Sequence, residues 1–300
     1  MNGPLGSGKP WRELHGRAGA LARALPPLMV EARRVAVSVM HGVHGRRSAG
    51  PGEDFWQYRP YGHGDDAAGI DWRKSARSEK VLVRETEWMA ANSLWLWVQS
   101  DAGMDHRSEL AARSKRHRAA LIALALAMLA QKGGERVAAL GGPFRPDHTR
   151  AALERLARWL APEVTTRREA VPPRAELARF STCVLVGDFF ADPPELEARI
   201  RALAARGARG HLLQVVDPAE EAFPFRGRVR FEDFASPRAV TFGRAEALRE
   251  DYLGELERHR AGLRELTRRL GWSFQVHRTD AAPARALLAL HERIGAPGRG

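Results

Sequence analysis

The sequence predicts an α/β protein: a doubly wound, mainly parallel sheet with helices on both faces, preceded by N-terminal helices and a small region of strands and turns. Two features of the chain from Leu94 onward carry this prediction. Apolar runs alternate with helical patterns, and such alternation produces parallel strands joined by right-handed crossovers. Within each run the apolar residues are consecutive, which is typical of strands covered by helices on both faces.

The expected elements follow in a regular order. After a leader at 1–10 that we expect to be disordered, helical patterns at 11–25 and 28–42 are separated by Pro26-Pro27, which ends one helix and begins the next. The segment 53–90 has the composition of short strands and turns. Apolar strands are expected at 94–98, 136–140, 182–187, 211–216 and 273–277. Helices are expected at about 108–132, 148–161, 193–206, 244–270 and 283–294.

The segment 223–242 interrupts this alternation. Two short β-prone runs flank Ser236-Pro237 and indicate a hairpin at an edge of the sheet. We therefore divide the chain into a leader at 1–10, an N-terminal region at 11–90 and an α/β domain at 91–300 that carries the hairpin as an insertion.

The net charge of +12 does not indicate a specific nucleic-acid-binding protein. Only five of the 48 basic residues are lysine, the arginines are scattered, and no basic cluster is interleaved with aromatic residues for base stacking. Cys183 is the only cysteine, so an intramolecular disulfide is excluded and a reducing compartment is indicated. The longest apolar run, 119–130, has twelve residues, against about 20 for a membrane span. We expect a cytoplasmic protein without a membrane span.

The most distinctive stretch of the chain is 51–87, which is dense in acids, arginines, aromatic residues and glycines. It contains the block GDDAAGIDWRKSAR at 64–77, preceded by Arg59-Pro60-Tyr61 and followed by VRETE at 83–87. These blocks resemble domain-of-unknown-function family 58, the von Willebrand factor A-like proteins that travel with MoxR-type AAA+ ATPases. The resemblance implies a von Willebrand A-like fold. It also implies a non-enzymatic adaptor that works with such an ATPase on an unknown client, in the assembly or remodelling of protein complexes.

The signature block has two interpretations. Its arginines have enough acids nearby for a partly buried ion-pair network, with Trp72 anchoring the loop in the core, and such a network would hold the N-terminal region onto the sheet domain. Alternatively, the same residues form a docking face for a partner. The residues concerned are Arg59, Asp65, Asp66, Asp71, Trp72, Arg73, Arg77, Arg84 and Glu85. We favour the structural interpretation, although the two are compatible.

A site is expected where the loop after the strand at 94–98 meets the loop after the strand at 182–187. The resemblance implies a magnesium site there, built on an Asp-x-Ser-x-Ser loop. Gln99 stands where that motif has its aspartate, Asp101 and Gly103 where it has its serines, Asp188 matches a later aspartate, and Thr149 is a candidate for its threonine. Two carboxylates could hold Mg²⁺ weakly. The alternative, which we favour, is that both aspartates cap nearby helices, so that no cofactor is required.

The sequence gives no positive sign of catalysis. It contains no Gly-x-Ser-x-Gly elbow, His-Glu-x-x-His helix or Gly-x-Gly-x-x-Gly fingerprint. The enzyme alternative is a Mg²⁺-dependent hydrolase, of the phosphatase or nuclease type, that uses Asp101 and Asp188.

Overall fold

A computed structural model of the protein describes residues 27–43, 55–60, 72–78, 80–86, 93–161, 167–178, 181–233 and 238–295. Within these residues a parallel five-stranded sheet has the spatial order β4-β3-β5-β6-β9. The bounds of its strands are β3 (Ser93–Val98), β4 (Arg136–Ala139), β5 (Thr182–Gly187), β6 (Arg209–Val216) and β9 (Ser273–Arg278). The five strands predicted from the sequence are confirmed, and so is the predicted pairing of the first with the third.

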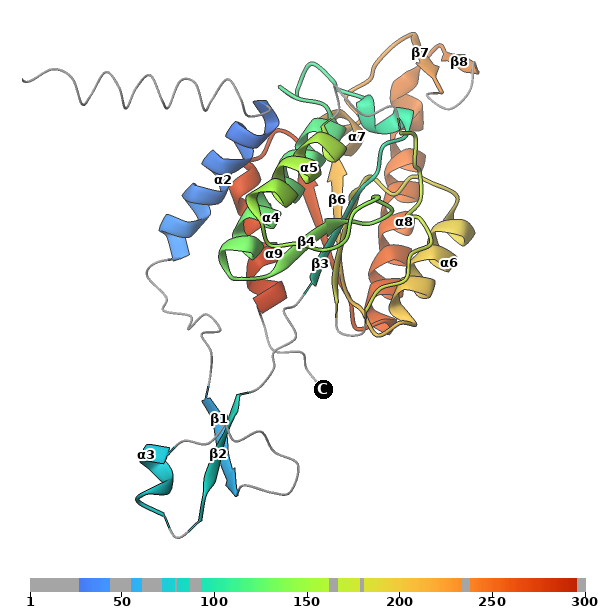
Figure 1. Ribbon diagram of the computed structural model, residues 1–300. Coiled ribbons are helices and arrows are strands. Elements are labelled where there is room, and N and C mark those ends of the chain that lie inside the picture. Colours follow the sequence, from blue (N-terminus) through green and yellow to red (C-terminus); the bar gives the residue numbers. More distant parts are fainter. Residues whose placement is uncertain are drawn as a thin grey trace, which may run out of the picture.

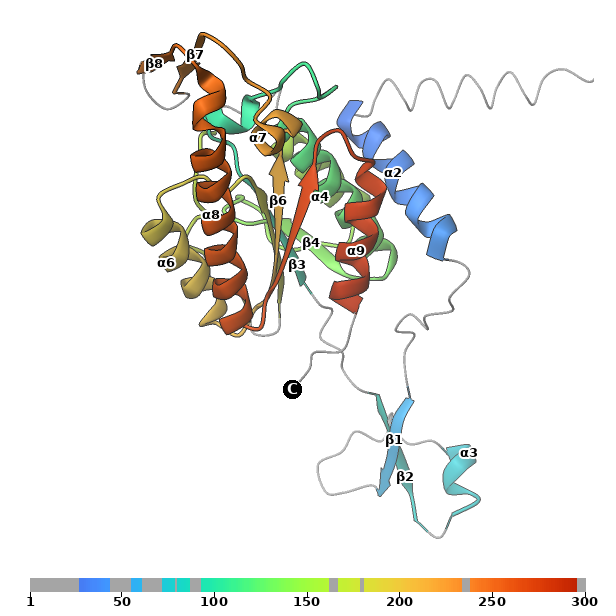
Figure 2. The same cartoon turned by 180° about the vertical axis from the view of Figure 1, so that it is seen from behind.

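Helices cover both faces of this sheet, as predicted, and Figures 1 and 2 show the two layers from opposite sides. One layer contains α2 (Pro27–Val43), α4 (Lys115–Lys132), α5 (Arg150–Leu160) and α9 (Pro283–Gly295). The other contains α6 (Pro193–Ala204) and α8 (Arg249–Arg269). The sheet is therefore the middle layer of a three-layer α/β sandwich.

The side chains of the central strands alternate between the two layers. Leu94, Leu96 and Val98 of β3 pack with α4 and its neighbours, whereas Trp97 packs on the opposite face with α6 and α8. Because both faces are covered, nearly every residue of these strands is apolar, and all six residues of β5 are buried. This is the origin of the consecutive apolar pattern in the sequence.

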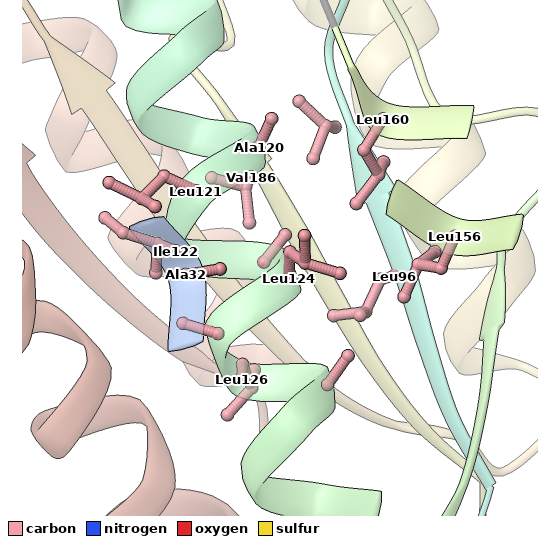
Figure 3. Close-up of a cluster of buried hydrophobic side chains, with 14 of the residues drawn as sticks. Ala32, Leu96, Ala120, Leu121, Ile122, Leu124, Leu126, Leu156, Leu160 and Val186 are labelled. Carbon is pink, nitrogen blue, oxygen red and sulfur yellow. The ribbon is translucent and has the colours of Figure 1, made fainter. Parts of the chain in front are cut away.

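Helix α4 lies in the middle of its layer. Every side chain from Ala119 to Ala127 is buried, because the sheet covers one side of the helix and α2 and α9 cover the other. Figure 3 shows Leu96, Leu124 and Ala32, from the sheet, α4 and α2, meeting in this core. The apolar run at 119–130 is thus a buried helix, as expected. None of the helices that the structure describes is long and apolar enough to cross a bilayer.

Two boundaries differ from the prediction. Helix α4 begins at Lys115 rather than near 108, because Ser114 caps it by accepting a hydrogen bond from the His117 amide (3.3 Å). The predicted helix at 244–270 begins as the 3-10 turn η3 (Ala245–Leu248) before α8.

The predicted hairpin forms, with β7 (Val229–Glu232) antiparallel to β8 (Ala239–Phe242). Its predicted place at a sheet edge is wrong, since the two strands make a separate sheet. The reason is an aromatic cluster of the insertion itself, in which the ring of Phe223 contacts those of Phe225, Phe231 and Tyr252. This cluster attaches the hairpin to the first turns of α8 instead of to a strand of the main sheet.

The N-terminal region is described in part. Helix α2 confirms the pattern at 28–42, whereas the leader at 1–10 and the helix at 11–25 lie outside the described residues. The strands β1 (Phe55–Pro60) and β2 (Leu82–Thr86) form an antiparallel ribbon joined to the short helix α3 (Trp72–Ser75). Figures 1 and 2 both draw this ribbon apart from the sandwich. The domain boundaries at 10 and 90 remain a prediction.

The expected core position of Trp72 is wrong, since its side chain is 67% exposed. It begins α3 on the isolated ribbon, where no layer of the sandwich covers it. Arg73 and Arg77 are also exposed. Of the other residues of the predicted network, Asp65, Asp66 and Asp71 lie outside the described residues, and only the backbone is described for Arg59, Arg84 and Glu85. The ion-pair network that we predicted for the signature block therefore remains a prediction.

Candidate functional site

The candidate site lies where β3 and β5 end side by side, between the first and third strands of the sheet. The strand order reverses at this point, because β4 lies on one side of β3 and all later strands lie on the other. We call this place the carboxyl rim and define it by the loop Gln99–Gly103, the turn Gly187–Phe189 and Glu220. The predicted meeting of the first two segments is confirmed, since Gln99 and Asp188 are hydrogen-bonded to each other.

Gln99 is the central hydrogen-bonding group of the carboxyl rim. Its Nε2 donates to Asp101 Oδ1 (2.7 Å) and to Asp188 Oδ1 (2.8 Å), and its Oε1 accepts from the Phe189 amide (2.9 Å). The opposite orientation of the amide would place a carbonyl oxygen against two carboxylates, so these roles are fixed by chemistry. Gln99 is fully buried, and its position therefore determines how the two aspartates face each other.

Gly187 makes room for this glutamine. A Cβ atom at position 187 would lie 2.3 Å from Gln99 Oε1 and 2.7 Å from Gln99 Cβ, much closer than atoms can pack. The glycine at the end of β5 is thus required by the side chain next to it, and not by an unusual backbone conformation. In the next turn Phe189 is the residue with a positive φ, of 60°.

Lys115 is the main site residue that sequence reasoning missed. Its Nζ donates to Asp188 Oδ2 (2.8 Å) and to Glu220 Oε1 (2.5 Å), and its side chain is almost fully buried. Burial by itself lowers the pKa of the ammonium group, but the charges of Asp188 and Glu220 outweigh it and raise that pKa above its ordinary value. Lys115 is therefore a permanent positive charge inside the carboxyl rim.

Glu220 reaches the carboxyl rim from the short helix α7 (Pro218–Ala222), which follows β6. Asp217 and Glu220 form a capping box: Asp217 Oδ1 accepts from the Ala219 amide, and Glu220 Oε2 accepts from the Asp217 amide (2.8 Å). This arrangement leaves Glu220 Oε1 directed at Lys115. Glu220 was not predicted for this site because it follows the fourth strand, whereas the predicted acids follow the first and third.

The Asp188 carboxylate accepts three hydrogen bonds, which engage both of its oxygens. Its Oδ1 accepts from Gln99 and from the Phe190 amide (3.0 Å), and its Oδ2 accepts from Lys115. Asp101 differs, because only its Oδ1 accepts from Gln99, while its Oδ2 lies near Gly103. Burial raises the pKa of the Asp101 carboxyl, the charge of Asp188 adds to this, and the hydrogen bond from Gln99 opposes it.

The capping interpretation of the two aspartates is wrong. Asp101 does precede the 3-10 turn η2 (Ala102–Asp105), but its side chain makes no capping hydrogen bond. Helix α6 is capped by Asp192, whose side chain accepts from the Glu195 amide, and not by Asp188. Both carboxylates instead accept hydrogen bonds within the carboxyl rim, from Gln99 and, at Asp188, also from Lys115.

The proposed role of Thr149 is also wrong. The chain after β4 runs back along that strand, where Asp147 pairs with Val137, so Thr149 caps α5 at the far end of the sandwich. The neighbouring His148 carbonyl accepts a hydrogen bond from Gln131 in the last turn of α4. Lys115 begins that helix, so a rise of 1.5 Å per residue separates the two ends by about 24 Å.

Comparison with known proteins identifies the family. The model of a family described as "Protein of unknown function DUF58" matches residues 57–262. The chain belongs to the DUF58 family. Uncharacterized proteins of Mycobacterium tuberculosis and of Mycobacterium bovis are each 28% identical to this DUF58 chain over 274 residues, which is 87% of this chain and 85% of theirs.

Two solved structures are similar to this DUF58 chain. One is the conserved hypothetical protein BatB from Bacteroides thetaiotaomicron, with a TM-score of 0.36 and 9% identity. The other is an aerotolerance-related membrane protein from Bacteroides fragilis, with a TM-score of 0.38 and 11% identity. Each alignment covers 68% of this chain and 98% of the other.

The residues of the carboxyl rim do not fit the magnesium ion that the resemblance implies. Mg²⁺ needs oxygen lone pairs around it, but Gln99 turns its NH₂ group toward Asp101 and Asp188, and the Lys115 ammonium occupies the other oxygen of Asp188. Gly103 supplies no ligand atom. Among the residues that the structure describes, no three His, Cys, Asp or Glu side chains are grouped so as to hold a metal. We therefore derive no chemistry through a metal in this DUF58 protein.

A cavity of about 950 Å³ opens beside the carboxyl rim, between it and α8. Its lining includes Asp101 and Lys115 on the rim side, and Tyr252 and His259 on the α8 side. The ring of Phe190, 44% exposed, lies 5.6 Å from Lys115 Nζ and 5.3 Å from the His259 ring. Burial lowers the pKa of His259 and raises that of Tyr252 to about 12, so both side chains are uncharged at neutral pH. The cavity thus combines carboxylates with uncharged aromatic walls.

Proposed function

We propose that this DUF58 protein is a non-enzymatic protein-binding module that acts as an adaptor, and that it binds its partner at the cavity beside the carboxyl rim. The observation that supports this most directly is that both oxygens of Asp188 are engaged, by Gln99, Lys115 and the Phe190 amide. A carboxylate engaged on both oxygens is a poor general base or nucleophile, because its lone pairs are already directed at donors.

The same contacts count against the hydrolase alternative. That mechanism needs Asp101 and Asp188 to bind a metal together, whereas the Gln99 NH₂ group lies between them as a shared donor. Asp101 is the rim carboxylate that accepts the fewest hydrogen bonds from other residues, since only its Oδ1 accepts from a side chain, that of Gln99. One such group beside an open cavity is better suited to contacting a partner than to hydrolysis.

The identity of the partner rests on the resemblance of the signature block at 64–77. We propose a MoxR-type AAA+ ATPase, with a client protein whose complex the pair assembles or remodels. We also propose a cytoplasmic location, which suits a chain whose single cysteine, Cys183, is buried and carries no disulfide.

A pull-down with a MoxR-type ATPase from the same organism tests this proposal. The wild-type chain should retain the ATPase, Phe190→Asp should lose it because this exposed ring is part of the cavity wall, and Val276→Thr should retain it. Val276 is the matched control, since it is similarly exposed (37%) but lies on the edge strand β9. Failure of the wild-type chain to retain the ATPase, or equal retention by Phe190→Asp, would contradict the proposal.

A panel of phosphatase and nuclease substrates with Mg²⁺ tests the alternative. We expect no turnover by the wild-type chain or by Asp101→Ala. Turnover by the wild-type chain that Asp101→Ala abolishes would establish the hydrolase and reject the adaptor.

A further inference from the structure

The carboxyl rim holds more negative charge than a buried site can carry without a cation. Asp188 is 2% exposed, and Glu220 and Asp101 lie on either side of it, each linked to it through one shared donor. Carboxylates that share a hydrogen-bond donor lie close together, and in a low-dielectric environment they repel one another strongly. In many proteins a bound divalent cation removes this repulsion, but here the donors present are the Lys115 ammonium and the Gln99 amide.

We infer that the Lys115 ammonium group takes the place of a divalent cation at the carboxyl rim, so that the site keeps its shape without a metal. Lys115 links acids from two separate loops, Asp188 after β5 and Glu220 after β6, as a bridging metal ion would. Its stem is buried among the layer that contains α4, so the cation is attached covalently to the core of the fold. This inference concerns the rim alone and does not depend on the proposed partner.

The neighbouring residues are consistent with a built-in cation of single charge. An aspartate at position 99 would add a fourth carboxylate to those of Asp101, Asp188 and Glu220, whereas glutamine adds no charge and donates to both aspartates. Gly103 leaves space at Asp101, since a Cβ atom there would lie 3.3 Å from Asp101 Oδ2. Removal of Lys115 should therefore create a vacancy lined by carboxylate oxygens, which a divalent cation could fill.

Thermal unfolding of the purified full chain, with EDTA or with millimolar MgCl₂ or MnCl₂, tests this inference. The wild-type midpoint should be the same in all three conditions. Lys115→Met should unfold about 10 °C lower in EDTA, because it leaves buried carboxylates without their counter-charge. Divalent cation at about 100 times its dissociation constant should then raise the midpoint of this variant by about 5 °C.

Arg116→Met is the matched control. Arg116 is the next residue of α4, it is equally buried, and it pairs with Asp105 (3.2 Å) rather than with the acids of the carboxyl rim. Its loss should lower the midpoint without creating a cation site, so the midpoint should not respond to Mg²⁺ or Mn²⁺. An equal response in Arg116→Met and Lys115→Met would mean that the effect is unspecific, and it would overturn the inference.

Two further results would overturn it. One is a rise of the wild-type midpoint with Mg²⁺ that Asp188→Asn abolishes, because a metal would then bind with Lys115 in place. The other is a folded Lys115→Met chain that responds to neither cation. If Lys115→Met does not fold, Lys115→Met combined with Glu220→Gln removes one of the unbalanced charges. That double variant should fold and respond to Mn²⁺ at the position vacated by the ammonium group, beside Asp188 Oδ2, and a lack of response would reject the inference in the same way.

Discussion

Gly187→Ala is the most direct test of the rim geometry. The added methyl would lie 2.3 Å from Gln99 Oε1 and 2.7 Å from Gln99 Cβ, and the glutamine has no space to retreat because it is fully buried. Overpacking of this kind costs about 1–3 kcal/mol. Displacement of the Gln99 amide also weakens its bonds to Asp101 and Asp188, at about 1–3 kcal/mol for the buried acceptors. We expect a loss of about 3–5 kcal/mol in the free energy of unfolding.

Urea unfolding followed by tryptophan fluorescence measures this loss. The midpoint should fall while the slope m stays unchanged, since the surface exposed on unfolding is the same. Gly254→Ala is the control: nothing lies within 4 Å of a Cβ atom there, and the residue is inside α8. That substitution should stabilise the chain by about 0.5–1 kcal/mol. A Gly187→Ala midpoint within error of wild type would refute the rim geometry.

A second measurement assigns the cost to the contact between these two residues. In a Gln99→Gly background both of the nearest clashing atoms are gone, so Gly187→Ala should then cost clearly less than in the wild-type chain. An unchanged cost would mean that the methyl is rejected by something other than Gln99.

Two further predictions follow from buried titratable groups. Burial lowers the pKa of His211 and of His277 to about 4, so the unfolded chain binds more protons than the folded chain between pH 6.5 and 4. The free energy of unfolding should therefore fall as the pH drops through this window, by about 3 kcal/mol for each histidine. In His277→Gln this fall should be about half as steep. An unchanged dependence on pH in that variant would contradict the prediction. Burial also raises the pKa of the Cys183 thiol to about 12, so a thiol reagent should label this cysteine in urea and not in buffer. Rapid labelling of the native chain would contradict the burial of strand β5.

The sheet could be predicted because its signal is local. The central strands are apolar on successive residues for the same reason that they are buried on both faces, and the six buried residues of β5 are contiguous in the sequence. Their alternation with helices then fixes a parallel sheet, and a site between the first and third strands follows. Errors arose where a boundary depends on one hydrogen bond, as at Ser114, which begins α4 seven residues later than its pattern indicated.

Lys115 could not be found in this way because its partners are distant in the sequence. Asp188 is 73 residues further along the chain and Glu220 is 105, and they reach the rim from the ends of two different strands. The cluster Lys115-Arg116-His117-Arg118 looks like an ordinary basic surface when it is considered alone. Trp72 shows the opposite error, since it was expected to anchor the signature loop in the core although no layer covers it.

One signal for Lys115 was nevertheless present. Positive charge is unfavourable at the N-terminus of a helix, where the dipole is already positive, yet basic residues open a helix that continues with the uninterrupted apolar run 119–130. A buried lysine in that position can be stable only if acids from other elements lie against it. In a parallel sheet the helix N-termini and the strand ends share one rim, so those acids had to come from the loops after strands. The acids at the carboxyl rim therefore surround a cation that belongs to the chain itself, the ammonium group of Lys115 at the start of α4.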